Sequence, residues 1–138
     1  MSAMTSEDVD GRRQVVGCRE VHVRGRGVLL VREAAGPRGA PTLILLDGLG
    51  TDVAFARDGT ARIAAFARRF RVIAPDRPGY GHFDDCADDV AALIRQERCG
   101  PVLLAGSSLD GPIAERLCRR HPDVVAGAAL VLARRSAA

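Results

Sequence analysis

The sequence predicts an α/β fold in which helices flank an open, mostly parallel sheet. Short, continuously apolar segments alternate along the chain with segments of helical character, and this alternation is typical of βαβ units with right-handed crossovers. The 138 residues fit one domain, and an apolar content of 47% is enough for a core. Aromatic residues make up only 4%, so aliphatic and alanine side chains must fill the interior.

The N-terminal region is predicted to be a disordered lead-in over residues 1–13, followed by a single domain over residues 14–138. The lead-in is polar and acidic and lacks the apolar stretch of a signal peptide. From Val15 to Val31, β-branched residues alternate or cluster on either side of Gly25-Arg26-Gly27. This pattern predicts a hairpin or two antiparallel strands. The Gly- and Pro-rich residues 36–41 are predicted to form a loop.

Four further strands and three helices are predicted in the rest of the domain. The strands are short apolar runs of the kind that parallel sheets bury on both faces. They are Thr42–Leu46, Arg71–Ala74, Pro101–Ala105 and Gly127–Ala133. The helices are predicted from apolar residues that recur on one side, and the second also has Asp residues in its first turns, where the helix dipole favours them. They are residues 60–69, Asp84–Arg98 and 112–120.

Composition and charge argue against several classes of function. The 20 basic and 17 acidic residues give a net charge of +3, and no aromatic residues interleave with the arginines. We therefore expect a solvated surface and no nucleic-acid partner. No apolar run reaches the length of a membrane span, so we expect no membrane partner. The cysteines show neither C-x-x-C spacing nor a histidine at a ligand interval, which predicts no metal site and reduced thiols in a cytoplasmic protein.

The segment between the third apolar strand and the helix after it carries a candidate catalytic motif. Its residues, Gly106-Ser107-Ser108-Leu109-Asp110, are close to the pattern Gly-x-Ser-x-Gly, and Gly111 follows at once. In such a nucleophile elbow, a sharp strand-to-helix turn exposes the serine Oγ above the sheet, and small residues let the strand and the helix approach closely. Taken alone, the pattern favours a tight structural connection between the strand and the helix.

Three motifs together resemble the α/β-hydrolase superfamily over residues 28–132. The run Gly106 to Ala114, continuing to Arg120-His121-Pro122, is similar to the elbow and the helix that follows it in that family. The run Ala74 to Gly81 resembles the family's Asp-x-x-Gly-x-Gly loop. The run Leu45 to Gly50 resembles its His-Gly-x-Gly loop, with Asp47 in place of the histidine. The resemblance implies an incomplete α/β-hydrolase-like fold, truncated after the strand that follows the elbow.

The resemblance implies roles for individual residues. Ser108 would be the nucleophile, and the backbone N–H groups of Leu49 and Leu109 would form the oxyanion hole. Asp47 would place a carboxylate near that oxyanion site, and Asp110 would place another where the elbow favours glycine. These two aspartates are interpreted either as drift in a protein released from catalysis or as a pair for acid/base chemistry.

A serine nucleophile also needs a base and an acid that orients the base. In the family both come later in the chain, and here only Arg134 to Ala138 follow the last predicted strand. His22 is predicted to lie in an early strand, and His121 is predicted to be structural. His82 follows the carboxyl end of a strand and is the candidate base within this chain. We expect the chain to be catalytically impaired by itself.

Three functions stay open at this point. The first is a hydrolase acting on an ester- or amide-type small molecule through Ser108, without metal or organic cofactor. The second is a non-catalytic relative that binds a small molecule or a partner protein. The third is an acid/base enzyme that uses Asp47, His82 and Asp110. The last predicted strand would also leave an exposed apolar edge over Ala128–Ala133, which predicts a homodimer or a complementing chain.

Overall fold

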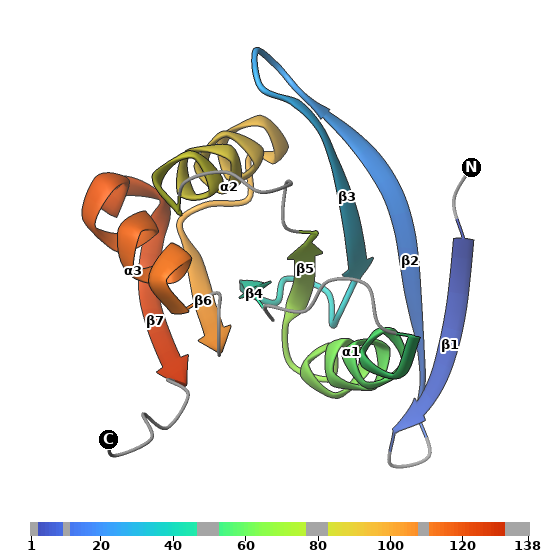
Figure 1. The fold of residues 1–138 in the computed structure, drawn as a ribbon. Coiled ribbons are helices and arrows are strands. Elements are labelled where there is room, and N and C mark those ends of the chain that lie inside the picture. The colour runs from blue at the N-terminus through green and yellow to red at the C-terminus, as the bar shows by residue number, and fades with distance from the viewer. Residues whose placement is uncertain (1–2, 10–11, 47–52, 77–82, 108–110, 132–138) are drawn as a thin grey trace, which may run out of the picture.

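The structure of the chain, a computed structural model, describes residues 3–9, 12–46, 53–76, 83–107 and 111–131. Its strands form one open sheet with the order β1-β2-β3-β5-β4-β6-β7 (Figure 1). The strands are β1 Ala3–Val9, β2 Arg12–Val23, β3 Gly27–Ala34, β4 Thr42–Leu46, β5 Arg71–Pro75, β6 Val102–Ser107 and β7 Val125–Val131. The helices are α1 Val53–Phe66, α2 Phe83–Glu97 and α3 Gly111–Arg120, with a short 3-10 helix η2 at Pro122–Val124.

The N-terminal part of the sheet corrects one expectation and confirms another. The expected disordered lead-in contains strand β1, which pairs antiparallel with β2 from Ala3 opposite Cys18 to Val9 opposite Arg12. The sequence does not predict this strand because its side chains are mostly polar and give no apolar pattern, whereas strands pair through their backbone groups. The predicted hairpin is confirmed: β2 pairs antiparallel with β3, and the turn between them lies at the predicted glycines.

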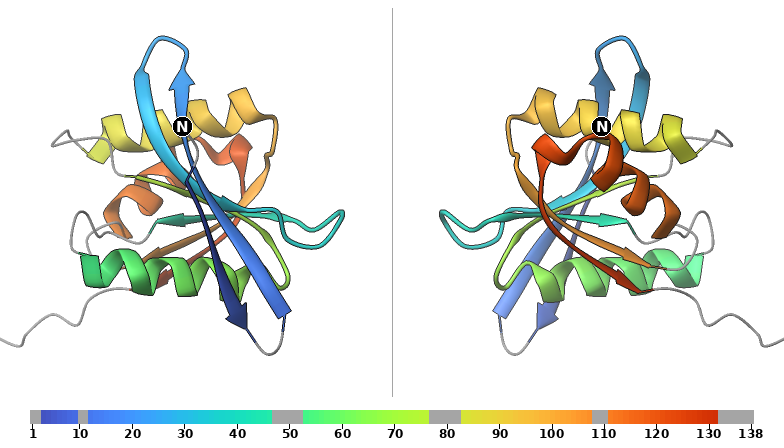
Figure 2. Two further views of the ribbon diagram at one scale, coloured as in Figure 1. Left: turned by 90° about the vertical axis from the view of Figure 1, so that its right-hand side faces the viewer. Right: turned by 90° about the vertical axis from the view of Figure 1, so that its left-hand side faces the viewer.

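Four strands of the sheet are parallel to one another, as predicted. β4 pairs with β5 on one side and with β6 on the other, and β6 pairs with β7. The strand order reverses at β4, because the chain steps one way to reach β5 and then the other way to reach β6 and β7. Right-handed crossovers therefore place α1 on one face of the sheet and both α2 and α3 on the other (Figure 2).

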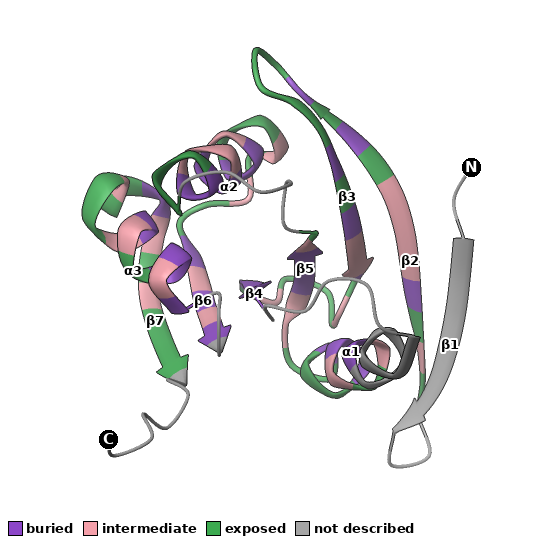
Figure 3. Cartoon of the chain, in the orientation of Figure 1, coloured by how far each residue is buried: buried purple, intermediate pink, exposed green. Residues whose placement is uncertain are grey.

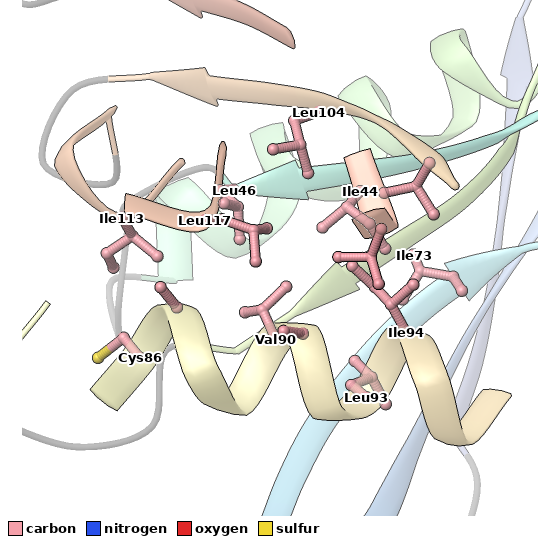
Figure 4. Packing of buried hydrophobic residues seen from close by; sticks show 14 of the residues in the cluster. Ile44, Leu46, Ile73, Cys86, Val90, Leu93, Ile94, Leu104, Ile113 and Leu117 are labelled. Carbon is pink, nitrogen blue, oxygen red and sulfur yellow. The ribbon is translucent and has the colours of Figure 1, made fainter. Parts of the chain in front are cut away.

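The larger part of the core lies between the sheet and helices α2 and α3. Strand residues such as Ile44 and Ile73 meet Val90 and Ile94 of α2 and Leu117 of α3, and each of these side chains is at most 2% exposed (Figure 4). A smaller cluster lies under α1. It contains Val16, Ala34, Leu45, Ile63, Ala64, Ala67, Val72 and Ala74.

Most element boundaries agree with the sequence predictions to within two residues, and α1 differs most. It begins at Val53, ahead of the expected residue 60, and ends at Phe66. At its end, the N–H groups of Arg69 and Phe70 both donate to the Phe66 carbonyl, at 3.0 Å each. The following turn packs tightly against the predicted loop: a Cβ on Gly36, whose φ is +68°, would lie 2.2 Å from the Phe70 carbonyl oxygen. Only glycine fits this approach.

Candidate functional site

The carboxyl ends of the parallel strands lie at one edge of the sheet, and this edge is the candidate site. β4 ends at Leu46, which pairs in register with Gly106 near the end of β6. β5 lies on the other side of β4 and ends at Pro75. The segments 47–52, 77–82 and 108–110 therefore follow strand ends that are neighbours in the sheet. The strand order also reverses here, which is where open α/β sheets collect their ligand sites.

The residues predicted for the site lie in these three segments, outside the described residues. They are Asp47, Leu49, His82, Ser108, Leu109 and Asp110. The elements on either side of the elbow segment are those expected for a nucleophile elbow, because residues 108–110 connect the end of the parallel strand β6 to the start of helix α3. The sequence prediction of which strands these loops follow is thereby confirmed, while the roles of the six residues stay predictions.

Helices α2 and α3 begin side by side at this edge. Gly111 is buried at the start of α3, and Ile113 of α3 and Cys86 of α2 belong to the same buried cluster (Figure 4). The guanidinium of Arg116 lies over the Phe83 ring, 5.1 Å from its centroid, and its Nε lies 3.0 Å from an Asp84 carboxylate oxygen. A cation over an aromatic face and a charge pair both favour this arrangement. The two helix starts that border the candidate site are thus held together.

Two of the three histidines lie elsewhere. His121 follows α3 at the opposite edge of the sheet, where η2 leads into the first residue of β7. Its Nε2 lies 2.6 Å from an oxygen of Asp88 on α2. The pKa of the Asp88 carboxyl is lowered to about 2, mainly by hydrogen bonds from Arg120, with His121 adding to the effect. His121 therefore joins the end of α3 to α2, which is a structural contact away from the candidate site.

His22 is exposed on β2, and its backbone carbonyl accepts a hydrogen bond from Gln96 Nε2 at 2.7 Å. The third histidine, His82, lies in segment 77–82. Within the described part of the chain, no group of three or more His, Cys, Asp or Glu side chains could hold a metal ion. Likewise, none of the described helices is long and apolar enough to cross a membrane.

An apolar groove of about 660 Å³ lies on the α1 face of the sheet. Sequence reasoning did not predict this groove. The signal that could have located it is the run of small residues in β7, which offers little side-chain volume to fill the space. The groove is lined by Leu43, Leu45, Arg62, Phe66, Phe70, Leu103, Leu104, Ala105, Gly106, Gly127, Ala128 and Ala129.

No protein-family model matches the chain. A relative is the magnesium-chelatase 30 kDa subunit of Rhodobacter capsulatus, which is 32% identical over 97 residues. That match covers 63% of this chain and 33% of the subunit, and its name does not bear on hydrolysis. The chain therefore spans about a third of the length of this relative.

Solved structures show the same arrangement of strands and helices. E-2-(acetamidomethylene)succinate hydrolase matches with a TM-score of 0.63 and 30% identity, over 80% of this chain and 42% of that one. Haloalkane dehalogenase from Bradyrhizobium elkani USDA94 matches with a TM-score of 0.66 and 27% identity, over 86% of this chain and 43% of that one. The chain thus spans about two fifths of their length. By its fold, the chain belongs to the α/β-hydrolases, of which it holds part of the sheet with the helices around it.

Proposed function

We propose that this chain carries the nucleophile part of a hydrolase site for an ester- or amide-type small molecule, with Ser108 as the nucleophile. One observation carries the proposal: β5, β4 and β6 lie side by side in parallel, and the segments with His82, Asp47 and Ser108 follow their carboxyl ends. The likeness to an enzyme named as a hydrolase supports the reaction class.

In the proposed reaction, Ser108 Oγ attacks the substrate carbonyl carbon while a base accepts the hydroxyl proton. The negative charge that develops on the carbonyl oxygen is stabilised by the backbone N–H groups of Leu49 and Leu109. The leaving group then departs with a proton from the same base, and water later releases the acyl group. The base proposed within this chain is His82.

The two aspartates of the motifs lower the activity that we expect. A carboxylate at Asp47 near the oxyanion opposes the negative charge of the transition state. The Cβ of Asp110 crowds a position that favours glycine. We therefore expect slow covalent reaction of the chain alone. A non-catalytic role in binding a small molecule at the same sheet edge is the alternative, and acid/base chemistry by Asp47, His82 and Asp110 is the second.

The test is labelling of the purified chain with a fluorophosphonate, read by intact mass. A serine activated by a base forms a covalent phosphonyl adduct with loss of fluoride, and we expect one adduct per chain. Ser108→Ala is expected to abolish the label, while the matched variant Ser107→Ala keeps it. His82→Ala is expected to slow labelling at least about tenfold if His82 is the base.

The alternatives have separate outcomes. Absence of labelling in a chain that unfolds cooperatively would overturn the proposed hydrolase chemistry for this chain and favour the binding role. Labelling that persists in Ser108→Ala would show that the labelled nucleophile is another residue.

A further inference from the structure

The first turn of α2 lies at the edge of the candidate site and begins outside the core. Phe83 and Asp84 are both exposed (Figure 3), whereas Cys86 and Ala87 are buried. The core therefore holds α2 from Cys86 onward, and its first two residues depend on other contacts. These residues matter for the proposed site, because His82, the candidate base, is bonded directly to Phe83.

The guanidinium of Arg116 supplies contacts to both of these residues. It lies over the Phe83 ring, 5.1 Å from the centroid, and its Nε lies 3.0 Å from a carboxylate oxygen of Asp84. Its Nη1 donates to the backbone carbonyl of Pro112 at 3.4 Å. One side chain of α3 thus contacts the first two residues of α2 and the second residue of its own helix.

The position of Arg116 in α3 explains how its side chain reaches this edge. Helical side chains lean toward the N-terminus of their helix, so a residue in the second turn covers the surface beside the first turn. The other two arginines of α3 have different partners. Arg120 lies 2.8 Å from Asp88, one turn further along α2, and Arg119 lies 2.8 Å from Glu115 within α3. Among the arginines of α3, Arg116 therefore holds the residues nearest the candidate site.

We propose that Arg116 is a positioning residue for the hydrolase reaction, because it fixes the start of α2 against the start of α3. This inference rests on the proposed function, in which His82 is the base and Ser108 the nucleophile. His82 directly precedes α2, and Ser108 lies three positions before Gly111, the first residue of α3. A shift of one helix start against the other is therefore expected to change how the base meets the nucleophile. A misplacement of about 1 Å between reacting groups can lower a rate about 100-fold.

The chemistry of the three contacts favours orientation more than stability. A guanidinium is planar, stacks on aromatic faces and donates in fixed directions, so it fixes a ring, a carboxylate and a carbonyl relative to one another. The side chains of Arg116 and Asp84 are 40% and 52% exposed, and ion pairs this exposed contribute little to stability. Loss of Arg116 should therefore affect the rate of the reaction more than the stability of the fold.

The rate of fluorophosphonate labelling tests the proposal in the full chain. Arg116→Met keeps an unbranched side chain but removes the charge and the donors. It should slow labelling about three- to tenfold, up to the loss expected when the base is removed. Arg116→Lys keeps the charge and should recover part of the lost rate. Arg119→Met is the matched control and should label at the wild-type rate, because the partner of Arg119 lies in its own helix.

A double-mutant cycle with the candidate base separates positioning from a purely structural role. If Arg116 acts through the placement of His82, Arg116→Met should cause no further loss of rate in His82→Ala, because there is no base left to position. A structural role would slow both backgrounds equally. Circular dichroism melts establish that each variant is folded at the labelling temperature. If Arg116→Met does not fold, Asp84→Asn carries the test from the α2 side, because Asp84 is exposed and its loss removes the same ion pair.

The outcomes for the two proposals differ. A wild-type chain that is not labelled would overturn the proposed function and the role of Arg116 with it. A labelled wild type together with an equally fast Arg116→Met would overturn the positioning role alone. A loss of rate that is the same with and without His82 would also overturn it, because Arg116 would then act by another route than the placement of the base.

Discussion

On one face of the parallel strands, Ile44 meets Ile94 of α2 and Leu117 of α3, and none of the three is more than 1% exposed. On the other face, Ala105 and Ala129 of the same sheet border an open groove. The outer sides of the covering helices differ too. α2 and α3 are joined by ion pairs such as Arg120 with Asp88 at 2.8 Å, whereas the exposed positions described on α1 are apolar.

The difference between the faces follows from the strand order. Since crossovers are right-handed, the face on which a helix lies depends on the direction in which the chain steps between strands. Only the step from β4 to β5 sends a helix to the α1 face, and both later steps send helices to the other face. A strand whose sequence is apolar along its whole length is therefore not always covered on both faces by the described residues.

The largest expected effect contrasts neighbouring residues of β4. Ile44→Ala should lower the free energy of unfolding by about 3–4 kcal/mol, because it leaves an enclosed cavity in the core under α2 and α3. Leu43→Ala should cost about 2 kcal/mol, because the vacated space opens into the groove and adds little cavity energy. Urea unfolding measures both values. Equal losses would contradict the distinction between the two faces.

A smaller contrast comes from enlarging alanines on the two faces. Ala114→Leu should destabilise the fold by about 1–3 kcal/mol, because Ala114 is fully buried in α3 and the close-packed core cannot expand. Ala129→Leu should change stability by less than about 0.5 kcal/mol, because its side chain extends into the groove. Thermal unfolding in dilute protein, where association between copies does not contribute, compares the two. A comparable loss in both variants would show that the groove is filled.

The network on the outer side of α2 and α3 should contribute about 1 kcal/mol, once solvent screening is considered. The folded pKa of Asp88 is about 2, below its ordinary value of 3.8. Its stabilising effect is therefore present above the ordinary value and is lost as the pH falls through about 2. Asp88→Asn should remove this contribution at pH 7 and flatten stability between about pH 4 and pH 2. An unchanged acid profile would rule out this role.

The smallest effect is expected for an exposed ion pair on α3. Glu115 lies one helical turn before Arg119, with a carboxylate oxygen 2.8 Å from the guanidinium, but both side chains are more than half exposed. Glu115→Ala should lower the free energy of unfolding by no more than about 0.5 kcal/mol. Urea unfolding at two salt concentrations checks this value. A loss above 1 kcal/mol would mean that this outer surface is more tightly organised than its exposure indicates.

The elements that the sequence predicted well share a strong local signal. Thr42–Leu46 is a strand in both the prediction and the structure, because a continuous apolar run bounded by turn residues has few other stable conformations. The α2 segment combines acidic residues in its first turn with apolar residues on one side, and its predicted bounds differ by one residue at each end. The carboxyl edge that holds the candidate site follows from the same alternation of strands and helices.

The N-terminal strand, the start of α1 and the groove could not be predicted in the same way. β1 is held by backbone pairing with β2, and its side chains do not reveal that pairing. The first half of α1 contains Arg57, Asp58 and Gly59, which interrupt the apolar period and hide where the helix begins. The groove depends on which face each crossover helix covers, and this is fixed by the order of the strands in space.

The sequence by itself determined the α/β class, the order of the elements and the strand ends that the candidate site residues follow, because these depend on local apolar patterns and turn residues. The tertiary structure alone decided that β1 joins the sheet, that α2 and α3 share one face and that the other face is left with a groove beside α1. These features depend on contacts between segments far apart in the chain, and a local pattern does not specify its distant partner.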